Sequence, residues 1–199
     1  MTAAAIARPR VLADLLPGAL LRDILLVIGA AAFTGLCAQV SIPLPFTPVP
    51  ITLQTFAVLL SGAALGPWRG GAAMLLYLVA GVAGVPWFAG QESGYSGDVV
   101  FTFGYIIGFV VAATVVGALA SRGADRTVSG TLAIMVLGNL IIYAFGVPWL
   151  MATAGMPLFL ALENGLWPFV IGDALKIALA AGLLPLAWRL AGKNPPASG

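Results

Sequence analysis

The chain has 199 residues, of which 61% are hydrophobic and only 8% are charged, and its formal net charge is +2. A mean hydropathy of +1.06 excludes a water-soluble domain of this size and predicts an integral membrane protein. The length allows about six spanning helices with short loops and leaves no room for a separate soluble catalytic domain. We therefore expect one all-α membrane domain over residues 1–199.

Residues 1–20 carry Arg8, Arg10 and Asp14 among apolar residues at roughly helical spacing. This pattern predicts a short helix that lies on the membrane surface. The first long apolar run begins only near Leu21 and lacks a small-residue cleavage site, so we expect no signal peptide.

The first predicted span, residues 21–40, contains small residues that recur four positions apart. Small residues let a second helix approach closely. Two interpretations follow: this face packs inside the same chain, or it docks a partner protein. The residues of the face are Ala30, Ala31, Thr34, Gly35 and Ala38.

Residues 41–52 read SIPLPFTPVPIT, and their prolines remove backbone donors and favour extended conformations in their neighbours. No helix is expected here. Apolar non-helical backbone avoids lipid, so the segment either folds over the protein and lines a cavity or serves as a stiff linker. Its candidate lid residues are Phe46, Thr47, Pro48 and Pro50.

Further spans are predicted at 53–66, 71–85, 102–121, 131–150 and 169–189. The segment 53–66 is short enough to be re-entrant, but charge favours a full crossing. If it crosses, the basic residues all fall on one side, in keeping with the positive-inside tendency. These residues are Arg8, Arg10, Arg22, Arg69, Arg122, Arg126, Arg189 and Lys193. We therefore predict six spans with both termini in the cytoplasm.

Two external segments and one helix end hold further candidates. Residues 86–101 contain Gln91 among polar and aromatic residues that either cover a pocket or are solvated. Residues 151–167 are consistent with a short interfacial helix. Tyr105 lies between Gly104 and Gly108, and its hydroxyl either reaches a pocket or anchors the chain at the membrane interface.

The last predicted span contains an acid and a base, Asp173 and Lys176, inside an otherwise apolar run. A charge at membrane depth costs about 2.5–3.5 kcal/mol on insertion scales, so the pair indicates a functional site. Positions three apart share one face of a helix. If the helix starts at Pro168, the two residues lie ~8 and ~12 Å deep, in the outer third of the membrane. The pair either neutralises itself or binds a ligand from outside.

The sequence has no histidine and one cysteine, Cys37, which lies in an apolar run. The commonest metal ligand and general base are therefore missing. We expect no metal, no cofactor and no nucleic-acid partner.

Several motifs resemble one known family. The stretch 45–56 (PFTPVPITLQTF), followed by Gly62 and Leu65-Gly66-Pro67, is similar to the signature of the biotin-transporter S-component family, BioY. So are Pro168-Phe169 with 172–176 (GDALK), while 102–109 resembles the family's TGGYLxGF segment. Phe101 and Phe103 stand where many members have Pro and Gly.

The resemblance implies the six-helix substrate-capture subunit (S component) of an energy-coupling-factor (ECF) importer. It implies a biotin pocket near the outer surface, closed by the first external loop, with Asp173 and Lys176 as ligand contacts. Gln54, Tyr105 and Gln91 are looser candidates. An ionised Asp173 could accept from the ureido N–H groups, while Lys176 could donate to either the ureido oxygen or the carboxylate. The expected surroundings are a bacterial cytoplasmic membrane, a membrane-spanning coupling subunit and ATPase subunits.

Two other functions remain open. One is a stand-alone or proton-coupled carrier for biotin or another small vitamin, in which Asp173 titrates. The other is an intramembrane enzyme that uses Asp173 and Lys176 as an acid and base. No Ser or Cys nucleophile is evidently paired with a base, so we expect no enzyme.

Overall fold

The computed structural model describes residues 11–18 and 20–192, which form a bundle of helices. The long helices are α1 (Leu20–Gln39), α2 (Gln54–Leu65), α3 (Pro67–Val82), α4 (Val99–Ala120), α5 (Val128–Ala154) and α7 (Val170–Leu190). The short helix α6 (Leu158–Gly165) lies between α5 and α7, and the strands β1 (Ser41–Leu44) and β2 (Thr47–Thr52) join α1 to α2. The predicted all-α membrane bundle with six long helices is confirmed. Three of the basic residues that were predicted to lie on one side of the membrane, Arg8, Arg10 and Lys193, fall outside the described ranges.

Helix boundaries differ from the predicted spans where local chemistry extends or shortens a helix. Helix α3 begins at Pro67, four residues before the predicted span, because the fixed φ of proline suits the first helical turn. Helix α5 continues through Pro148 and ends at Ala154, and the next residue, Gly155, adopts the left-handed conformation common after a helix C-terminus (φ 65°). Within the described ranges, four stretches are long and apolar enough to cross a membrane: Leu20–Gln39, Val99–Ala120, Val128–Ala154 and Leu158–Leu190. Helix α2, with 12 residues, is shorter than any of them.

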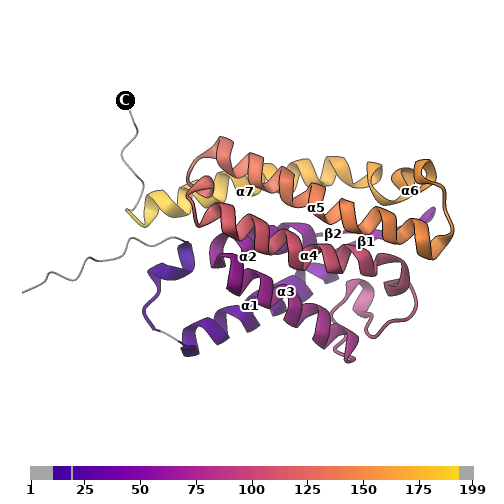
Figure 1. Ribbon diagram of the computed structural model, residues 1–199, viewed down its shortest axis with the longest axis horizontal. Helices are drawn as coiled ribbons and strands as arrows, with labels where there is room; N and C mark the ends of the chain where they lie inside the picture. Colours follow the sequence, from indigo (N-terminus) through magenta and orange to yellow (C-terminus); the bar gives the residue numbers. More distant parts are fainter. Residues whose placement is uncertain (1–10, 19, 193–199) are drawn as a thin grey trace, which may run out of the picture.

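Helix α4 is the centre of the bundle and packs against α2, α3 and α5. In Figure 1, α4 and α5 run side by side, with α6 and α7 along one edge and α1 and α3 along the other. Glycines permit the closest approaches. A Cβ added at Gly62 on α2 would lie 2.6 Å from the backbone oxygen of Ala113 on α4, and one at Gly108 would lie 3.0 Å from Cα of Ile142 on α5. Gly104 and Gly108 thus place α4 against α5, the usual role of a GxxxG pattern.

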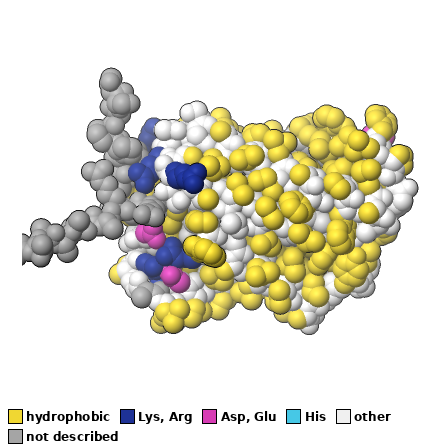
Figure 2. Space-filling view, in the orientation of Figure 1, with side chains coloured by type: hydrophobic (Ala, Val, Ile, Leu, Met, Phe, Trp, Pro, Cys, Tyr) yellow, Lys and Arg dark blue, Asp and Glu magenta, His cyan; other side chains and the backbone are white. Residues whose placement is uncertain are grey.

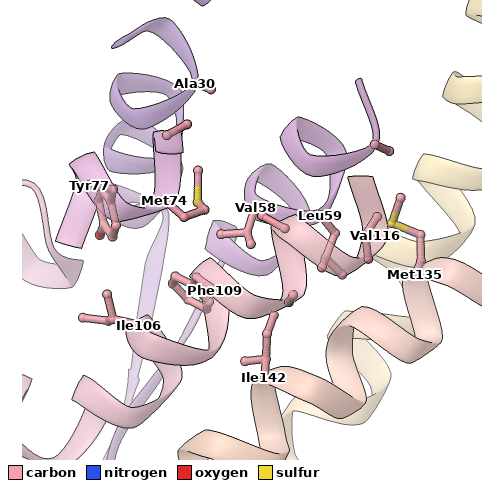
Figure 3. Close-up of a cluster of buried hydrophobic side chains, with 14 of the residues drawn as sticks. Ala30, Val58, Leu59, Met74, Tyr77, Ile106, Phe109, Val116, Met135 and Ile142 are labelled. Atoms are coloured by element: carbon pink, nitrogen blue, oxygen red, sulfur yellow. The ribbon is translucent and has the colours of Figure 1, made fainter. Parts of the chain in front are cut away.

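The apolar core lies where α2, α3, α4 and α5 meet (Figure 3). Val58 and Met74 are fully buried, and Phe109 and Ile142 are nearly so. Their burial fixes how each helix is rotated, and therefore which residues face the ends of the bundle.

The proline-rich segment is an antiparallel β-hairpin, with Ser41 opposite Thr52 and Leu44 opposite Thr47. The absence of helix was predicted, but the strand pairing was not. The register shifts between Ile42 and Leu44, where Pro43, which has no N–H to donate, occupies the irregularity.

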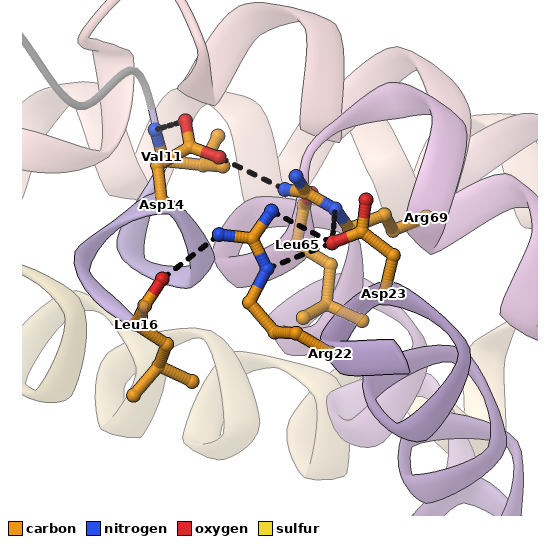
Figure 4. A network of polar contacts seen from close by, with 7 residues as sticks. All are labelled: Val11, Asp14, Leu16, Arg22, Asp23, Leu65 and Arg69. Carbon is orange, nitrogen blue, oxygen red and sulfur yellow. Dashed lines mark hydrogen bonds and ion pairs between the residues drawn. The ribbon is translucent and has the colours of Figure 1, made fainter. Parts of the chain in front are cut away.

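The Lys and Arg side chains visible in Figure 2 gather at one end of the bundle, away from the hairpin, whereas Lys176 lies in the last helix near the hairpin. At the end with the gathered side chains, Arg69 at the start of α3 pairs with Asp14 at 2.9 Å and with Asp23 at 3.0 Å (Figure 4). The N-terminal segment was expected as a helix on the membrane surface. Its described part contains a 3-10 helix (Leu12–Leu15) that contacts the protein, with Val11 beside it buried against Gly66, and its place at the membrane surface stays a prediction.

Candidate functional site

A cavity of about 240 Å³ lies at the end of the bundle opposite the arginines. Its walls come from the hairpin, the loop between α3 and α4, and residues of α2, α4, α5 and α7. This volume is slightly below the roughly 300–1,000 Å³ typical of pockets for drug-sized ligands, so the cavity suits a compact solute. The lining combines apolar side chains such as Phe88, Ile106 and Phe169 with a few polar groups.

The polar centre of the cavity is the ion pair predicted on the last span. Lys176 Nζ lies 3.0 Å from Oδ1 of Asp173, one turn earlier on α7. Thr55 on α2 joins both residues: its hydroxyl donates to Asp173 Oδ1 at 3.2 Å and accepts from Lys176 Nζ at 3.0 Å. Tyr143 on α5 donates to Asp173 Oδ2. Asp173 is only 5% exposed, and the four side chains, which come from three helices, form hydrogen bonds with one another.

Gln54 also lines the cavity, and its amide is held at both ends. Its Oε1 accepts from the hydroxyl of Thr52 at the end of β2, at 2.9 Å. Its Nε2 donates to the hydroxyl of Tyr77 on α3, at 2.8 Å. Tyr77 in turn donates to the backbone oxygen of Trp87. Gln54 therefore links the hairpin to the loop between α3 and α4, the two segments that cover the cavity.

Tyr105 lines the cavity with its ring, but its hydroxyl is already engaged. It donates to the backbone oxygen of Gly165 at 2.8 Å and so fixes the end of α6 to α4. Gln91 does not line the cavity: it is exposed, and its backbone N–H donates to Oε1 of Gln39. Its neighbours Gly90 and Glu92 occupy the wall instead.

Of the two interpretations of residues 41–52, the structure agrees with a segment that lines a cavity, and its role as a lid stays a prediction. Thr47, Pro48 and Pro50 line the cavity. Phe46, at the hairpin turn, does not; it is 60% exposed. Thr47 also donates to the backbone oxygen of Asn164 at 2.9 Å, which ties the hairpin to α6.

Two acidic side chains, Glu92 and Asp98, lie in the wall formed by the loop between α3 and α4. Burial raises the pKa of Glu92 above its ordinary value; the backbone N–H groups of Asp98 and Val99 oppose this rise, and the charge of Asp98 adds to it. No group of three or more His, Cys, Asp and Glu side chains that could hold a metal occurs in the described ranges.

Comparisons with known proteins assign this arrangement to a family. A family model described as BioY family matches residues 7–193. The chain belongs to the BioY family. The BioY-family chain is 35% identical to the biotin transporter BioY of Rhizobium etli over 168 residues, which is 80% of this chain and 89% of that protein. It is 39% identical to the biotin transporter BioY of Thermotoga maritima over 158 residues, 78% of this chain and 90% of that protein.

A solved structure shows the same fold. The crystal structure at 2.1 Å of the S-component for biotin from an ECF-type ABC transporter superposes with a TM-score of 0.76. It is 24% identical in sequence, and the alignment covers 87% of this chain and 93% of that one. The resemblance drawn from the sequence motifs of this BioY-family chain is thereby confirmed.

Two site residues of the BioY-family chain were missed from sequence. Thr55 follows Gln54 directly and was counted only as part of a motif. Tyr143 lies well inside α5, away from the helix ends where tyrosines commonly anchor at the membrane interface. A hydroxyl at that depth needs a partner inside the protein, and this signal could have identified it.

The predicted docking face of the first span needs correction. Ala30, Ala31 and Thr34 are buried, and Thr34 contacts Met74 of α3. Gly35 is buried too: a Cβ added there would lie 3.0 Å from Cβ of Trp87. Ala38 is fully buried. Of the two interpretations of this spacing, packing inside the chain is the one that the structure bears out, because α3 and the loop after it occupy this face.

Proposed function

We propose that this chain binds biotin from the external side of the membrane and mediates its uptake as the substrate-specific subunit of an ECF-type ATP-driven transporter. The observation that carries the proposal is the buried group of Asp173, Lys176, Thr55 and Tyr143 inside a cavity covered by the hairpin. Family membership and the names of the relatives support biotin as the ligand.

The chemistry of biotin suits these side chains. Its ureido ring offers two N–H donors and a carbonyl acceptor. Asp173 can accept from ureido N–H groups, and Lys176 can donate to the ureido oxygen or to the valerate carboxylate. Phe88, Ile106 and Phe169 can enclose the apolar thioether ring. Because Asp173 already accepts from three side chains, ligand binding has to rearrange at least one of these hydrogen bonds.

The proposal is for binding and transport without chemistry on the ligand. The Thr55 hydroxyl already donates to Asp173 and accepts from Lys176, and the relatives of this chain are named as transporters, which supports this part of the proposal. The sequence has no GxxxxGK[ST] motif, so ATP hydrolysis would come from ATPase partners through a membrane-spanning coupling subunit.

The proposed location is a bacterial cytoplasmic membrane, with lipid around the apolar sides of the bundle and both termini in the cytoplasm. The gathering of arginines at the end opposite the cavity supports this orientation. The cavity would then open to the outside.

The direct test is biotin titration of the purified chain in detergent, with Asp173→Asn and Lys176→Ala alongside. Each variant should weaken binding about tenfold or more, because hydrogen bonds to charged groups contribute about 1.5–3 kcal/mol. Leu175→Ala is the matched control, since Leu175 lies between the two on α7 and is 69% exposed. Absence of saturable binding to the wild type, or wild-type affinity in both site variants, would refute the proposal.

Uptake into proteoliposomes separates the two transport modes. Accumulation that needs the coupling subunit, the ATPases and ATP supports the ECF assembly. Accumulation by the chain alone, driven by a pH gradient, would replace it with a proton-coupled carrier.

A further inference from the structure

Asn139 on α5 is a buried polar residue that the proposed site does not use. It is 7% exposed. Its Nδ2 donates to the backbone oxygen of Met135 at 3.2 Å. Its Oδ1 is buried and has no hydrogen-bond partner among the described residues. Buried amide oxygens are nearly always paired, because losing water without gaining a donor is costly. This oxygen therefore requires a partner.

Asn139 lines a small void of about 10 Å³ between α2, α5 and α7. A void of this size holds about one water molecule. Its other polar neighbours are Thr55 and Lys176, and the rest of its wall is apolar, including Leu59 and Met135, which lie close together in Figure 3. One water could satisfy Asn139 here, since it would have three polar groups around it.

Lys176 and Thr55 line this void and also the large cavity. The Lys176 ammonium ion has three N–H donors. One goes to Asp173 Oδ1 and one to Thr55 Oγ1, both at 3.0 Å. No hydrogen bond of the third N–H is found among the described residues. Lys176 and Thr55 are thus the two polar residues that the space for a ligand shares with the void that Asn139 lines.

We infer that Asn139 is a positioning residue for Lys176: one water bound in the void accepts the third N–H of Lys176 and donates to Oδ1 of Asn139. When N–H donors of a ligand form hydrogen bonds with Asp173, Lys176 loses part of its interaction with that carboxylate. The hydrogen bond to the water, which in turn donates to Asn139, keeps the ammonium group in place and lowers the free-energy cost of this loss. This inference rests on the proposed function in that the ligand enters from the large cavity.

A double-mutant cycle on the full chain tests the inference, using Asn139→Leu, Lys176→Met and the double variant. Thermal unfolding without biotin comes first. The fall in Tm of the double variant should be clearly smaller than the sum of the two single shifts, because Asn139 has nothing to position once Lys176 is gone. Leu140→Ala, on the neighbouring lipid-facing position (57% exposed), should combine additively with Lys176→Met.

Biotin titration is the second measurement. Asn139→Leu should weaken binding about fivefold or more, within the range of couplings between contacting residues. If this variant does not fold, Asn139→Ala replaces it in both measurements, since alanine also removes the acceptor and adds no bulk. Additive Tm shifts, or unchanged biotin affinity in the Asn139 variant, overturn the inference. If the wild type binds no biotin, the proposed function fails, and the Tm cycle alone decides whether Asn139 and Lys176 are coupled.

Discussion

Tyr143 donates its hydroxyl to Oδ2 of Asp173, while Oδ1 of the same carboxylate accepts from Lys176 and Thr55. Both oxygens of this buried acid are therefore occupied by side chains of the protein itself. The contact also joins α5 to α7 across the cavity, so the ion pair is held by two neighbouring helices and not by α7 alone.

The first prediction concerns this contact. Tyr143→Phe should lower the free energy of unfolding by about 1.5–3 kcal/mol, because a hydrogen bond to a buried charged group is lost. Thermal and denaturant unfolding in detergent would measure the change. Phe145→Leu is the control on the same helix, since Phe145 is 41% exposed and its replacement should change the free energy by less than about 0.5 kcal/mol. Equal effects in the two variants would mean that the Tyr143 hydroxyl contributes nothing to stability.

The second prediction concerns the hydrogen bonds behind Gln54. Tyr77→Phe removes the acceptor of Gln54 Nε2 and the donor to the backbone oxygen of Trp87, and Tyr77 is fully buried. The backbone oxygen of Trp87 keeps Gln39 Nε2 as a donor at 3.2 Å, but Gln54 Nε2 is left unpaired, which should cost about 1–3 kcal/mol of stability. The substitution should also speed amide hydrogen exchange in residues 86–98, because the loop between α3 and α4 loses its tie to α2.

Tyr95→Phe is the matched control for Tyr77→Phe, since Tyr95 lies in that loop and is 51% exposed. Exchange rates in residues 86–98 should stay at the wild-type level in this control. Equal protection of the loop in both variants would argue against a link through Tyr77.

Part of this site could be predicted from the residue types and their spacing along the chain, and the rest depends on how distant helices pack together. Asp173 and Lys176 stand out because charge is expensive in an apolar helix and because a spacing of three sets both on one face. The proline-rich cover followed from the missing N–H groups. The ties of Thr55 and Tyr143 to Asp173 depend instead on how α2 and α5 are rotated against α7, over sequence separations of 118 and 30 residues.

The same limit explains the error on α1. Small residues at a spacing of four mark a face that something approaches closely, but spacing does not say what approaches it. The structure fills this face with α3 and Trp87, which depends on the path of the chain after α2. The strand pairing in residues 41–52 could not be predicted for a similar reason, because the prolines exclude a helix but do not determine which residues of two strands pair.

The third prediction follows from that correction. Ala31→Trp should destabilise the fold by about 1–3 kcal/mol or more, because Ala31 is fully buried and a large side chain there would force α1 away from its neighbours. The yield of monodisperse protein and its Tm would measure this. Ala32→Trp is the control: the adjacent residue is exposed, and the isolated chain should tolerate the change. A well-folded Ala31→Trp protein with wild-type Tm would contradict the packing seen on this face.

The fourth prediction concerns the opposite end of the molecule, where the carboxylate of Asp125 accepts from Nε1 of Trp188 at 2.7 Å. Asp125 is fully buried in the turn between α4 and α5, and the guanidinium of Arg126 lies 4.6 Å from the centre of the Trp188 ring. Burial raises the pKa of Asp125 above its ordinary value, although the Trp188 hydrogen bond and the charge of Arg126 oppose this rise.

A raised pKa in the folded state means that the folded protein binds this proton more tightly than the unfolded chain does. Asp125 should therefore add stability as pH falls through its raised pKa toward the ordinary value near 3.8, and should cost stability at neutral pH. Asp125→Asn keeps an acceptor for Trp188 without the charge, so it should match or exceed wild-type stability at pH 7, with the advantage shrinking at acid pH. Asp125→Leu leaves the Trp188 N–H unpaired and should lose about 1–3 kcal/mol. The free energy of unfolding of all three proteins would be measured at a series of pH values. An Asp125→Asn protein that is much less stable than wild type at pH 7 would show that the fold requires the charged form of Asp125.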